Sequence, residues 1–331
     1  MKRKTNMVVP TEFEKEVYEG LTHSPKHLSS KYIYDSYGDR LFQEIMDMPE
    51  YYLTNAEHQI FNSHKEEISN IFQNGNEKFK LIELGAGDGR KTKILLEQLV
   101  KDKANFKYQP IDISHSVLAQ LEAAIQNEIP EVCIETLQGT YFEILNRINI
   151  ENGTKKVILF LGSNIGNLLH DQAIDFLNHL RDFMHDDDLL FVGFDHKKNP
   201  QTVLNAYNDP AGITSDFNKN ILARINREMD ADIDLDQFLH WEVYDPESGT
   251  AKSYLVSKKD QSVFIKKLDL KINFNAWETI HTEISQKYDD HTVEWLAEQS
   301  GFQIEKKFVD TKGYYQNYVF AIKNELRTNH P

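Results

Sequence analysis

Short apolar runs alternate with helical patterns through the middle of the chain. Runs rich in Leu, Ile, Val and Phe predict buried strands at residues 81–84, 106–112, 132–137, 157–161 and 189–194. Apolar residues at helical spacing predict helices at residues 91–100, 115–127 and 170–185. This alternation of strand and helix is typical of βαβ units and predicts a doubly wound parallel sheet.

The alternation stops after Phe194 and resumes with a predicted helix near 291–300. Two predicted strands follow, at 302–309 and 315–322, and the short link between them contains Gly313. A short link joins antiparallel strands, because a parallel connection needs a longer crossover. The sequence therefore predicts an antiparallel hairpin at the edge of the parallel sheet.

The stretch between these two blocks is too long for a structureless loop, so residues 197–286 are expected to fold as a unit of their own. Helical spacing of apolar residues predicts an amphipathic helix over 217–229, and alternation from 240 to 274 predicts antiparallel strands. The N-terminal segment does not extend the βαβ pattern and is expected to pack with this insertion. The predicted domains are residues 58–196 plus 287–331, and residues 1–57 plus 197–286.

A glycine-rich turn follows the first predicted strand, in the stretch 80–93 (KLIELGAGDGRKTK). Gly85, Gly87 and Gly89 have no Cβ, so the backbone can turn sharply and approach a ligand closely. The spacing is G-x-G-x-G, not the G-x-G-x-x-G of dinucleotide-binding loops, and Glu83 stands two residues before the first glycine. This arrangement is common in S-adenosylmethionine (SAM) methyltransferases, although a glycine turn after a buried strand can also be purely structural.

The next predicted strand ends in a carboxylate, Asp112, about twenty residues beyond the glycine turn. A carboxylate at that place can bind ribose hydroxyls. It can equally cap the following helix, a role that Ser114 could also fill. Both alternatives put Asp112 at the carboxyl end of a strand, which is where open parallel sheets bind ligands.

A parallel sheet that ends in an antiparallel hairpin resembles the seven-stranded SAM-methyltransferase (Rossmann-like) fold more than a dehydrogenase fold. The expected fold class is therefore α/β, with this seven-stranded sheet and a second α+β substrate-binding domain. A nicotinamide-dependent oxidoreductase remains the competing interpretation at the level of the fold.

Composition narrows the possible partners. The chain has 331 residues, of which 40% are hydrophobic, and its formal net charge of −15 disfavours nucleic-acid and anionic-membrane binding. No apolar segment is long enough to cross a bilayer, and no secretory signal is expected. The lone cysteine, Cys133, excludes an internal disulfide and is predicted to lie in the core, and no ligand-spaced histidine cluster predicts a metal. A small-molecule substrate and a cytoplasmic location fit these features.

Further segments resemble the histidine-specific Nα-methyltransferase family of ergothioneine biosynthesis, and the resemblance runs through most of the chain. Several long motifs in the same order are hard to obtain by chance. They are 31–42 (KYIYDSYGDRLF), 48–57 (MPEYYLTNAE), 160–167 (FLGSNIGN), 207–214 (YNDPAGIT) with 217–220 (FNKN), and 282–288 (TEISQKY). Members of this family have a SAM domain plus a substrate domain made from the N-terminal segment and a later insertion, which is the layout predicted above.

The resemblance implies that Gly85, Gly87, Lys91 and Asp112 hold SAM. The glycine backbone would lie beside the methionine part, Asp112 would bind the ribose, and Lys91 would pair with the carboxylate of SAM. The structural alternative for Lys91 is a solvated lysine in the first turn of a helix. That alternative is disfavoured, because a cation destabilises the N-terminus of a helix unless an anion is near.

At the adenine edge the chain departs from the family. Where the family has an acidic residue next to an aromatic one, this chain has Thr140 before Tyr141. Tyr141 can still pack on the base, and Thr140 can accept one weaker hydrogen bond.

For the substrate, the resemblance implies contacts from Tyr34, Tyr51, Asn167, Tyr207, Glu283 and Ser285. Asn167 and Tyr207 would hold the backbone groups of a free amino acid, and Tyr34 would lie near its amino nitrogen. These three are the candidate catalytic residues, since amide and hydroxyl groups both donate and accept hydrogen bonds. Glu283 would face an imidazole side chain. Without its motif, any one of these tyrosines could equally be structural, and Asn167 could be a turn residue.

The implied activity is transfer of methyl groups from SAM, as methyl-donor cosubstrate and without a metal, to the α-amine of L-histidine, giving trimethylhistidine (hercynine). The enzyme is expected to be a monomer. Where histidine enzymes of the family carry a methionine, this chain has Ser253, which could enlarge or rewet the pocket. The alternatives are another amine such as a tryptophan derivative, an NAD-dependent oxidoreductase, and a SAM-binding protein without turnover.

Overall fold

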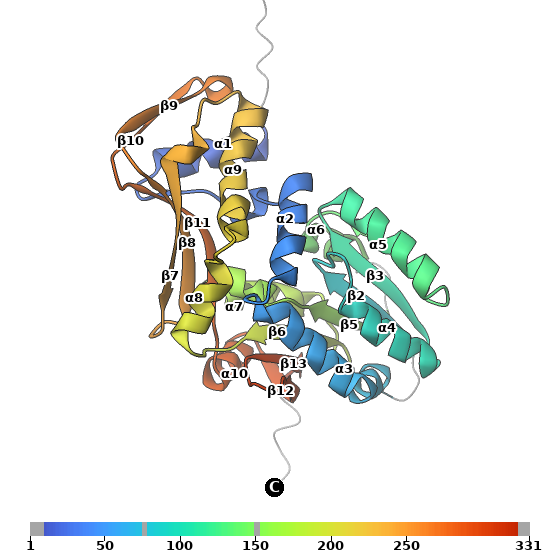
Figure 1. Cartoon of the computed structure of the whole chain (residues 1–331). Coiled ribbons are helices and arrows are strands. Elements are labelled where there is room, and N and C mark those ends of the chain that lie inside the picture. The colour runs from blue at the N-terminus through green and yellow to red at the C-terminus, as the bar shows by residue number, and fades with distance from the viewer. Residues whose placement is uncertain (1–9, 75–77, 149–152, 324–331) are drawn as a thin grey trace, which may run out of the picture. The chain divides into compact units, whose positions relative to one another are not determined.

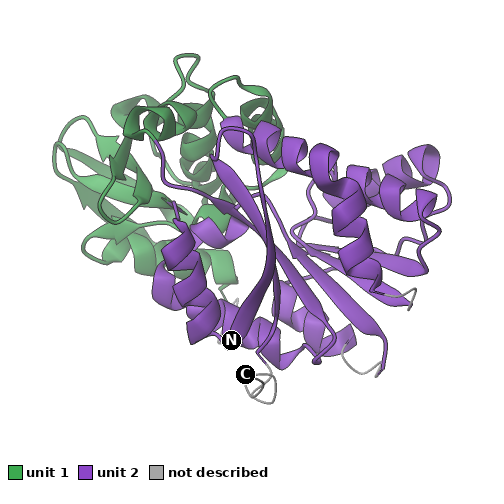
Figure 2. Cartoon of the chain, turned by 90° about the horizontal axis from the view of Figure 1, so that it is seen from below, with its two compact units in different colours: residues 1–51, 199–285 green, residues 52–198, 286–331 purple. Residues whose placement is uncertain are grey.

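The computed structural model describes residues 10–74, 78–148 and 153–323. The chain folds into two compact units, coloured green and purple in Figure 2. Unit 1 holds residues 1–51 and 199–285, and unit 2 holds residues 52–198 and 286–331.

The first boundary differs from the sequence-based expectation. The sequence predicts a division after residue 57, whereas the structure divides after Tyr51. The reason is α3 (Tyr52–Gln73), a continuous helix that packs against strands of the unit 2 sheet along its length, so its first turn belongs to that unit as well.

Unit 2 is built on a seven-stranded sheet. Across the sheet the strands are β12 (Phe302–Val309), β13 (Tyr315–Ile322), β6 (Leu189–Asp195), β5 (Lys155–Phe160), β2 (Phe79–Leu84), β3 (Phe106–Asp112) and β4 (Leu137–Gln138) (Figure 1). Strands β2 to β6 run parallel, and β13 pairs antiparallel with both β6 and β12. The predicted α/β fold with an antiparallel edge hairpin is confirmed.

Apart from α3, which precedes the first strand, the helices of unit 2 alternate with these strands in sequence, as the βαβ pattern predicts. They are α3, α4 (Thr92–Lys101), α5 (His115–Glu128), α6 (Tyr141–Ile148), α7 (His170–Asp182) and α10 (Asp290–Gln299), with a short 3-10 turn, η2 (Asn164–Asn167). Ile82, Ile158 and Val192, on neighbouring strands, are completely buried together with Leu177 of α7 and Leu296 of α10. Continuously apolar strands of this kind are typical of parallel sheets whose faces are covered by helices.

The strand predicted at 132–137 is largely wrong. Strand β4 has two residues, and upstream of it a single bridge joins Ile134 to Tyr108. The apolar side chain of Val132 is buried in the link after α5 without entering the sheet. Cys133 is exposed and is not the core residue that the pattern predicts, because the chain around it is not enclosed by neighbouring strands.

Unit 1 is α+β. Its four-stranded sheet has the order β1 (Lys26–His27), β11 (Thr279–Gln286), β8 (Thr250–Ser257) and β7 (Phe238–Asp245), and β9 (Gln261–Ile265) pairs with β10 (Leu270–Phe274). Its helices are α1 (Glu12–Thr22), α2 (Ser36–Asp47), α8 (Pro200–Tyr207) and α9 (Ile213–Met229), with 3-10 turns η1 (Ser30–Tyr32), η3 (Leu235–Gln237) and η4 (Lys266–Leu268).

Helix α9 organises unit 1. Its buried residues include Phe217, Ile221 and Ile225, and the helix lies against β7, β8 and β9, so the amphipathic helix expected over 217–229 is present. Helix α2 packs on α9, and β1 pairs in parallel with β11, which ties the N-terminal segment to the insertion. Along the described part of the chain, no helix is both long and apolar enough to cross a bilayer.

Candidate functional site

The glycine turn after β2 has the backbone that its sequence requires. Gly85, Gly87 and Gly89 have φ values of +72°, +54° and +67°, a region that side chains with a Cβ rarely adopt. A Cβ on Gly85 would come within 2.7 Å of the Tyr141 hydroxyl and 3.2 Å of the Asn164 amide nitrogen, whereas beside Gly87 no atom lies within 4 Å. The turn is therefore closely packed on one side and open at Gly87, as a loop that admits a ligand must be.

Asp112 is the last residue of β3, at the carboxyl edge of the sheet. Its carboxylate accepts hydrogen bonds from the backbone N–H of Ser114 at 2.9 Å and of Gly87 at 3.5 Å. Partial burial raises the pKa of this carboxyl above its ordinary value. Ser114 itself caps α5, with its hydroxyl accepting from the Val117 N–H. Asp112 is thus tied to the glycine turn and does not cap α5 itself.

Lys91 stands at the N-cap of α4. Its ammonium forms an ion pair with Glu57, whose side chain is completely buried, and a Cβ on Gly162 would lie 3.4 Å from the lysine nitrogen. The side chain therefore points toward the loop after β5 and has an anion beside it, so it is not a solvated first-turn lysine.

Tyr141 and Thr140 differ in their surroundings. The Tyr141 ring packs edge-on against Phe160, with ring centroids 6.1 Å apart, and burial raises the pKa of its hydroxyl. Thr140 is exposed, and its hydroxyl lies 3.4 Å from a carboxylate oxygen of Glu143 in the first turn of α6. A carboxylate, that of Glu143, therefore lies beside Thr140, three residues downstream of the position where the family pattern has an acidic residue. The three-residue spacing from Thr140 to Glu143 at the start of a helix is the sequence signal that could have identified Glu143 as a candidate.

In unit 1 five aromatic rings form a connected cluster. Tyr34 contacts Phe42 and Phe217 at centroid distances of 5.6 and 5.3 Å, Phe42 contacts Tyr51 at 6.3 Å, and Tyr51 contacts Tyr207 at 6.2 Å. All four contacts are edge-to-face, a geometry that stabilises aromatic pairs. Three of the predicted substrate residues are thus brought together from segments far apart in the sequence.

Strand β11 adds polar groups to this cluster. The hydroxyl of Ser285 lies 2.7 Å from that of Tyr207, and both residues are buried. Glu283 stands two residues before Ser285 on β11, so the two side chains share one face of the strand. Burial and the negative charge of Glu283 hold the pKa of Tyr34 well above its usual range. Five of the six predicted substrate residues therefore share one cluster in unit 1.

Asn218 is a residue of this cluster to which the sequence alone gives no role. It is completely buried, its amide donates to Glu283 at 3.4 Å, and its carbonyl oxygen accepts from the Thr282 hydroxyl at 2.7 Å. Asn218 therefore orients the carboxylate of Glu283. Ser253 reaches Asn218 only through Thr282, whose hydroxyl lies 3.2 Å from the Ser253 backbone carbonyl oxygen. The hydroxyl of Ser253 donates to Glu242 at 2.6 Å.

The sixth predicted substrate residue, Asn167, belongs to unit 2. It is the exposed last residue of η2, in the loop that follows β5. The predicted cofactor residues are also in unit 2, after the carboxyl ends of β2, β3 and β4.

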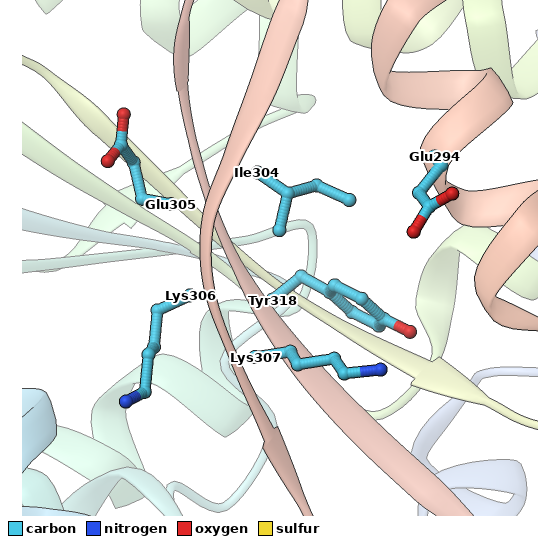
Figure 3. Close-up of a pocket in the computed structure, with 6 residues that line it drawn as sticks. All are labelled: Glu294, Ile304, Glu305, Lys306, Lys307 and Tyr318. Carbon is cyan, nitrogen blue, oxygen red and sulfur yellow. The ribbon is translucent and has the colours of Figure 1, made fainter.

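A hollow of about 480 Å³ elsewhere in unit 2 is not part of this site. Figure 3 shows its lining of Glu294, Ile304, Glu305, Lys306, Lys307 and Tyr318, from α10 and the β12–β13 hairpin. Its two lysines pair with carboxylates, Lys306 with Glu67 at 2.6 Å and Lys307 with Asp290 at 2.7 Å. Within residues 10–74, 78–148 and 153–323, no three His, Cys, Asp or Glu side chains are grouped so that they could hold a metal ion.

Comparison with known proteins decides the family. Residues 13–322 match the family described as "Histidine-specific methyltransferase, SAM-dependent". The chain belongs to this family. It is 34% identical over 299 residues to a histidine N-alpha-methyltransferase of Mycobacterium tuberculosis, covering 87% of this chain and 91% of that protein. It is 36% identical over 285 residues to the protein of the same name in Mycolicibacterium smegmatis, covering 86% and 87%. An ergothioneine biosynthesis protein 1 of Schizosaccharomyces pombe is 30% identical over 303 residues, covering 89% of this chain and 39% of that protein.

Membership of this family confirms that the protein is a SAM-dependent methyltransferase, with SAM as its methyl donor. The seven-stranded sheet with an antiparallel edge hairpin is the one that the sequence predicts for that fold. None of these matches favours the nicotinamide-dependent oxidoreductase.

Proposed function

We propose that this methyltransferase adds three methyl groups to the α-amino nitrogen of free L-histidine, giving hercynine. The observation that carries this proposal is the cluster of Tyr34, Tyr51, Tyr207, Glu283 and Ser285 in unit 1. It combines aromatic faces, which tolerate a growing ammonium, with one carboxylate that suits the N–H of an imidazole. The names of the bacterial relatives support the same substrate.

Unit 2 is proposed as the SAM-binding domain. The open space at Gly87, the Asp112 carboxylate tied to the glycine turn and the lysine at the start of α4 fit the three polar parts of SAM. Gly85 and Gly87 would admit its methionine part, Asp112 would bind its ribose and Lys91 its carboxylate. Tyr141, with Glu143 and Thr140 next to it, would meet the adenine.

Unit 1 is proposed as the substrate-binding domain. Within this unit, Tyr207 would hold the amino acid's backbone groups, and Tyr34 would lie near the amine. The family resemblance also gives Asn167 a role at the backbone groups. Glu283 would select the side chain, because its half-buried carboxylate can accept from the N–H of an imidazole, whereas an apolar ring offers it no hydrogen bond. Tyr51 and Ser285 would complete the surroundings of that side chain.

When bound, SAM would supply a methyl group attached to a cationic sulfur. The neutral amine would form the new N–C bond while the C–S bond breaks and S-adenosylhomocysteine leaves. The residues of the chain contribute alignment and exclusion of water. Tyr34 stays a neutral hydroxyl, since burial and Glu283 raise its pKa, so it is a hydrogen-bond partner of the amine and not a strong base. The proton that the amine loses leaves through water at these hydroxyls.

The net charge of −15 supports a small-molecule substrate over nucleic acid or an anionic membrane surface, and we propose a monomer that acts in the cytoplasm.

The proposal is tested by incubating the purified protein with SAM and each of the common amino acids in turn, with mass spectrometry of the products. Histidine should gain methyl groups in three successive steps, and the other amino acids should not. Titration with S-adenosylhomocysteine and with NADH is the companion measurement, in which only the former should bind. Methylation of a different amine in place of histidine would contradict the proposal.

A further inference from the structure

Glu57 is a completely buried carboxylate in α3 whose four hydrogen-bond donors come from three different parts of unit 2: the start of α4, the loop after β5, and β13. Its Oε2 accepts from the Lys91 ammonium and, at 2.9 Å, from the Gly162 backbone N–H. Its Oε1 accepts from the Tyr315 hydroxyl at 3.1 Å and from the Asn317 amide at 2.8 Å. Burying a carboxylate is costly unless its oxygens are paired, and here both are.

The neighbouring strand leaves room for this carboxylate. Gly193 lies on β6, and a Cβ there would come within 2.5 Å of the Glu57 Oε1 and 2.1 Å of the Tyr315 hydroxyl. Its φ is not in the left-handed region, so the glycine is required by space and not by backbone conformation. The sheet is therefore shaped around the Glu57–Tyr315 contact.

The loop that Glu57 contacts is a strained segment. Gly162 and Ser163 have φ values of +69° and +57°, and the second is a non-glycine residue in the left-handed region, which costs free energy unless neighbours hold it. The hydroxyl of Ser163 accepts from the Asp195 N–H at 3.1 Å, and the Ser163 N–H donates to the Tyr315 hydroxyl. Glu57 thus contacts this loop in two ways. It accepts directly from the Gly162 N–H, and it accepts from the Tyr315 hydroxyl, which in turn contacts Ser163.

The same loop continues into η2 and ends at Asn167. One carboxylate therefore fixes two groups with different tasks: the lysine proposed to bind the SAM carboxylate, and the loop that carries the asparagine proposed to bind the substrate. We propose that Glu57 is a positioning residue that aligns Lys91 for the methyl donor and the Asn167 loop for the acceptor. This proposal rests on the proposed function for the ligands assigned to Lys91 and Asn167.

The test is Glu57→Gln, which keeps the shape of the side chain and removes its charge. The matched control is Asp188→Asn. Asp188 is also buried in unit 2 and paired with a lysine, Lys156, at 3.0 Å, but it stands just before β6, at the opposite edge of the sheet from the glycine turn. Both variants should lower the melting temperature, and only Glu57→Gln should change ligand binding.

Two ligands separate positioning from general damage. S-adenosylhomocysteine has the amino-acid carboxylate, and 5′-methylthioadenosine keeps the adenosine and sulfur without it. Calorimetry on Glu57→Gln should show the Kd of S-adenosylhomocysteine raised by about tenfold, the size expected for a hydrogen bond to a charged group, with the Kd of 5′-methylthioadenosine changed less than about twofold. Equal weakening of both ligands, or no weakening, would overturn the proposal.

The effect on the loop is measured in a Lys91→Met background, where Glu57 can no longer act through the lysine. Adding Glu57→Gln should still raise the KM for the amino acid by about three- to tenfold, the size of one lost hydrogen bond. An unchanged KM would show that Glu57 acts only through Lys91 and would overturn its proposed role at the Asn167 loop.

If Glu57→Gln does not fold, Tyr315→Phe removes one of the four donors to Glu57. It should raise the Kd of S-adenosylhomocysteine more than that of 5′-methylthioadenosine, by a smaller factor than Glu57→Gln would. If the wild type binds S-adenosylhomocysteine but methylates no histidine, the proposed function fails while the comparison of the two ligands still stands.

Discussion

Removing the carboxylate of Glu283 tests how this enzyme selects its substrate. In Glu283→Ala the aromatic cluster of Tyr34, Tyr51 and Tyr207 is kept, and the variant loses the group that Asn218 orients at 3.4 Å. A hydrogen bond between a charged group and its partner contributes about 1.5–3 kcal/mol. Because each 1.4 kcal/mol is a factor of ten, kcat/KM for histidine should fall by about 10- to 150-fold.

The opposite change is expected for amino acids with apolar rings. An apolar ring offers the Glu283 carboxylate no hydrogen bond and displaces water from it in the wild type, a penalty of about 1–3 kcal/mol that the variant removes. For tryptophan and phenylalanine, kcat/KM should therefore hold or rise. Release of S-adenosylhomocysteine gives the rates for all three amino acids.

The control variant is Glu278→Ala. Glu278 stands immediately before β11 and pairs with Lys26, so the variant removes a carboxylate from the same strand region without touching the aromatic cluster. It should leave the preference among amino acids unchanged. If Glu283→Ala lowers kcat/KM for histidine, tryptophan and phenylalanine by the same factor, Glu283 does not select the side chain and the reasoning is wrong.

Three further predictions concern other parts of the site. Tyr207→Phe removes the 2.7 Å contact with Ser285 and should raise the KM for histidine by about two- to tenfold, as one neutral hydrogen bond would, while the Kd for S-adenosylhomocysteine in calorimetry stays the same. Glu143→Gln should raise that Kd about two- to fivefold if its carboxylate receives the adenine amino group next to Thr140, and an unchanged Kd would remove it from the site. Burial raises the pKa of Glu83 to about 7 from 4.5, so the folded state holds this proton more tightly and the free energy of unfolding should fall by about 3 kcal/mol as pH rises from 4.5 to above 7. Urea titrations should show that Glu83→Gln lacks this fall, and an identical pH dependence in the variant would contradict the shift.

The fold of unit 2 could be predicted because its central strands β2, β5 and β6 are buried almost along their whole length and helices with apolar stripes separate the strands. The hairpin of β12 and β13 matches its predicted residues because its link is short and β13 is buried along nearly its whole length, although the middle of β12 is exposed. The failure at 132–137 has the opposite cause. The run there makes a single bridge to Tyr108 of β3 and is otherwise an irregular link, and periodicity cannot distinguish such a run from a strand.

In the candidate site, some residues could be predicted from local sequence motifs, and others could not because their partners are far away in the chain. The motifs identify residues such as Gly85 and Tyr207, whose place depends on local sequence and on resemblance to a family. Glu57 and Asn218 escape that reasoning, because their partners Asn317 and Glu283 are 260 and 65 residues away in the chain. Only the folded structure brings such pairs together. Glu143 escaped for a simpler reason, since the acidic residue was sought at position 140.

The most direct test of the account is where on histidine the methyl groups arrive. With SAM labelled by 13C in its methyl group, the product can be examined by long-range proton–carbon NMR. The account predicts that the labelled methyl carbons correlate with the single α-proton of the amino acid, which requires them to be on the α-nitrogen. Correlations to the imidazole ring protons, or no labelled histidine although S-adenosylhomocysteine binds, would contradict it.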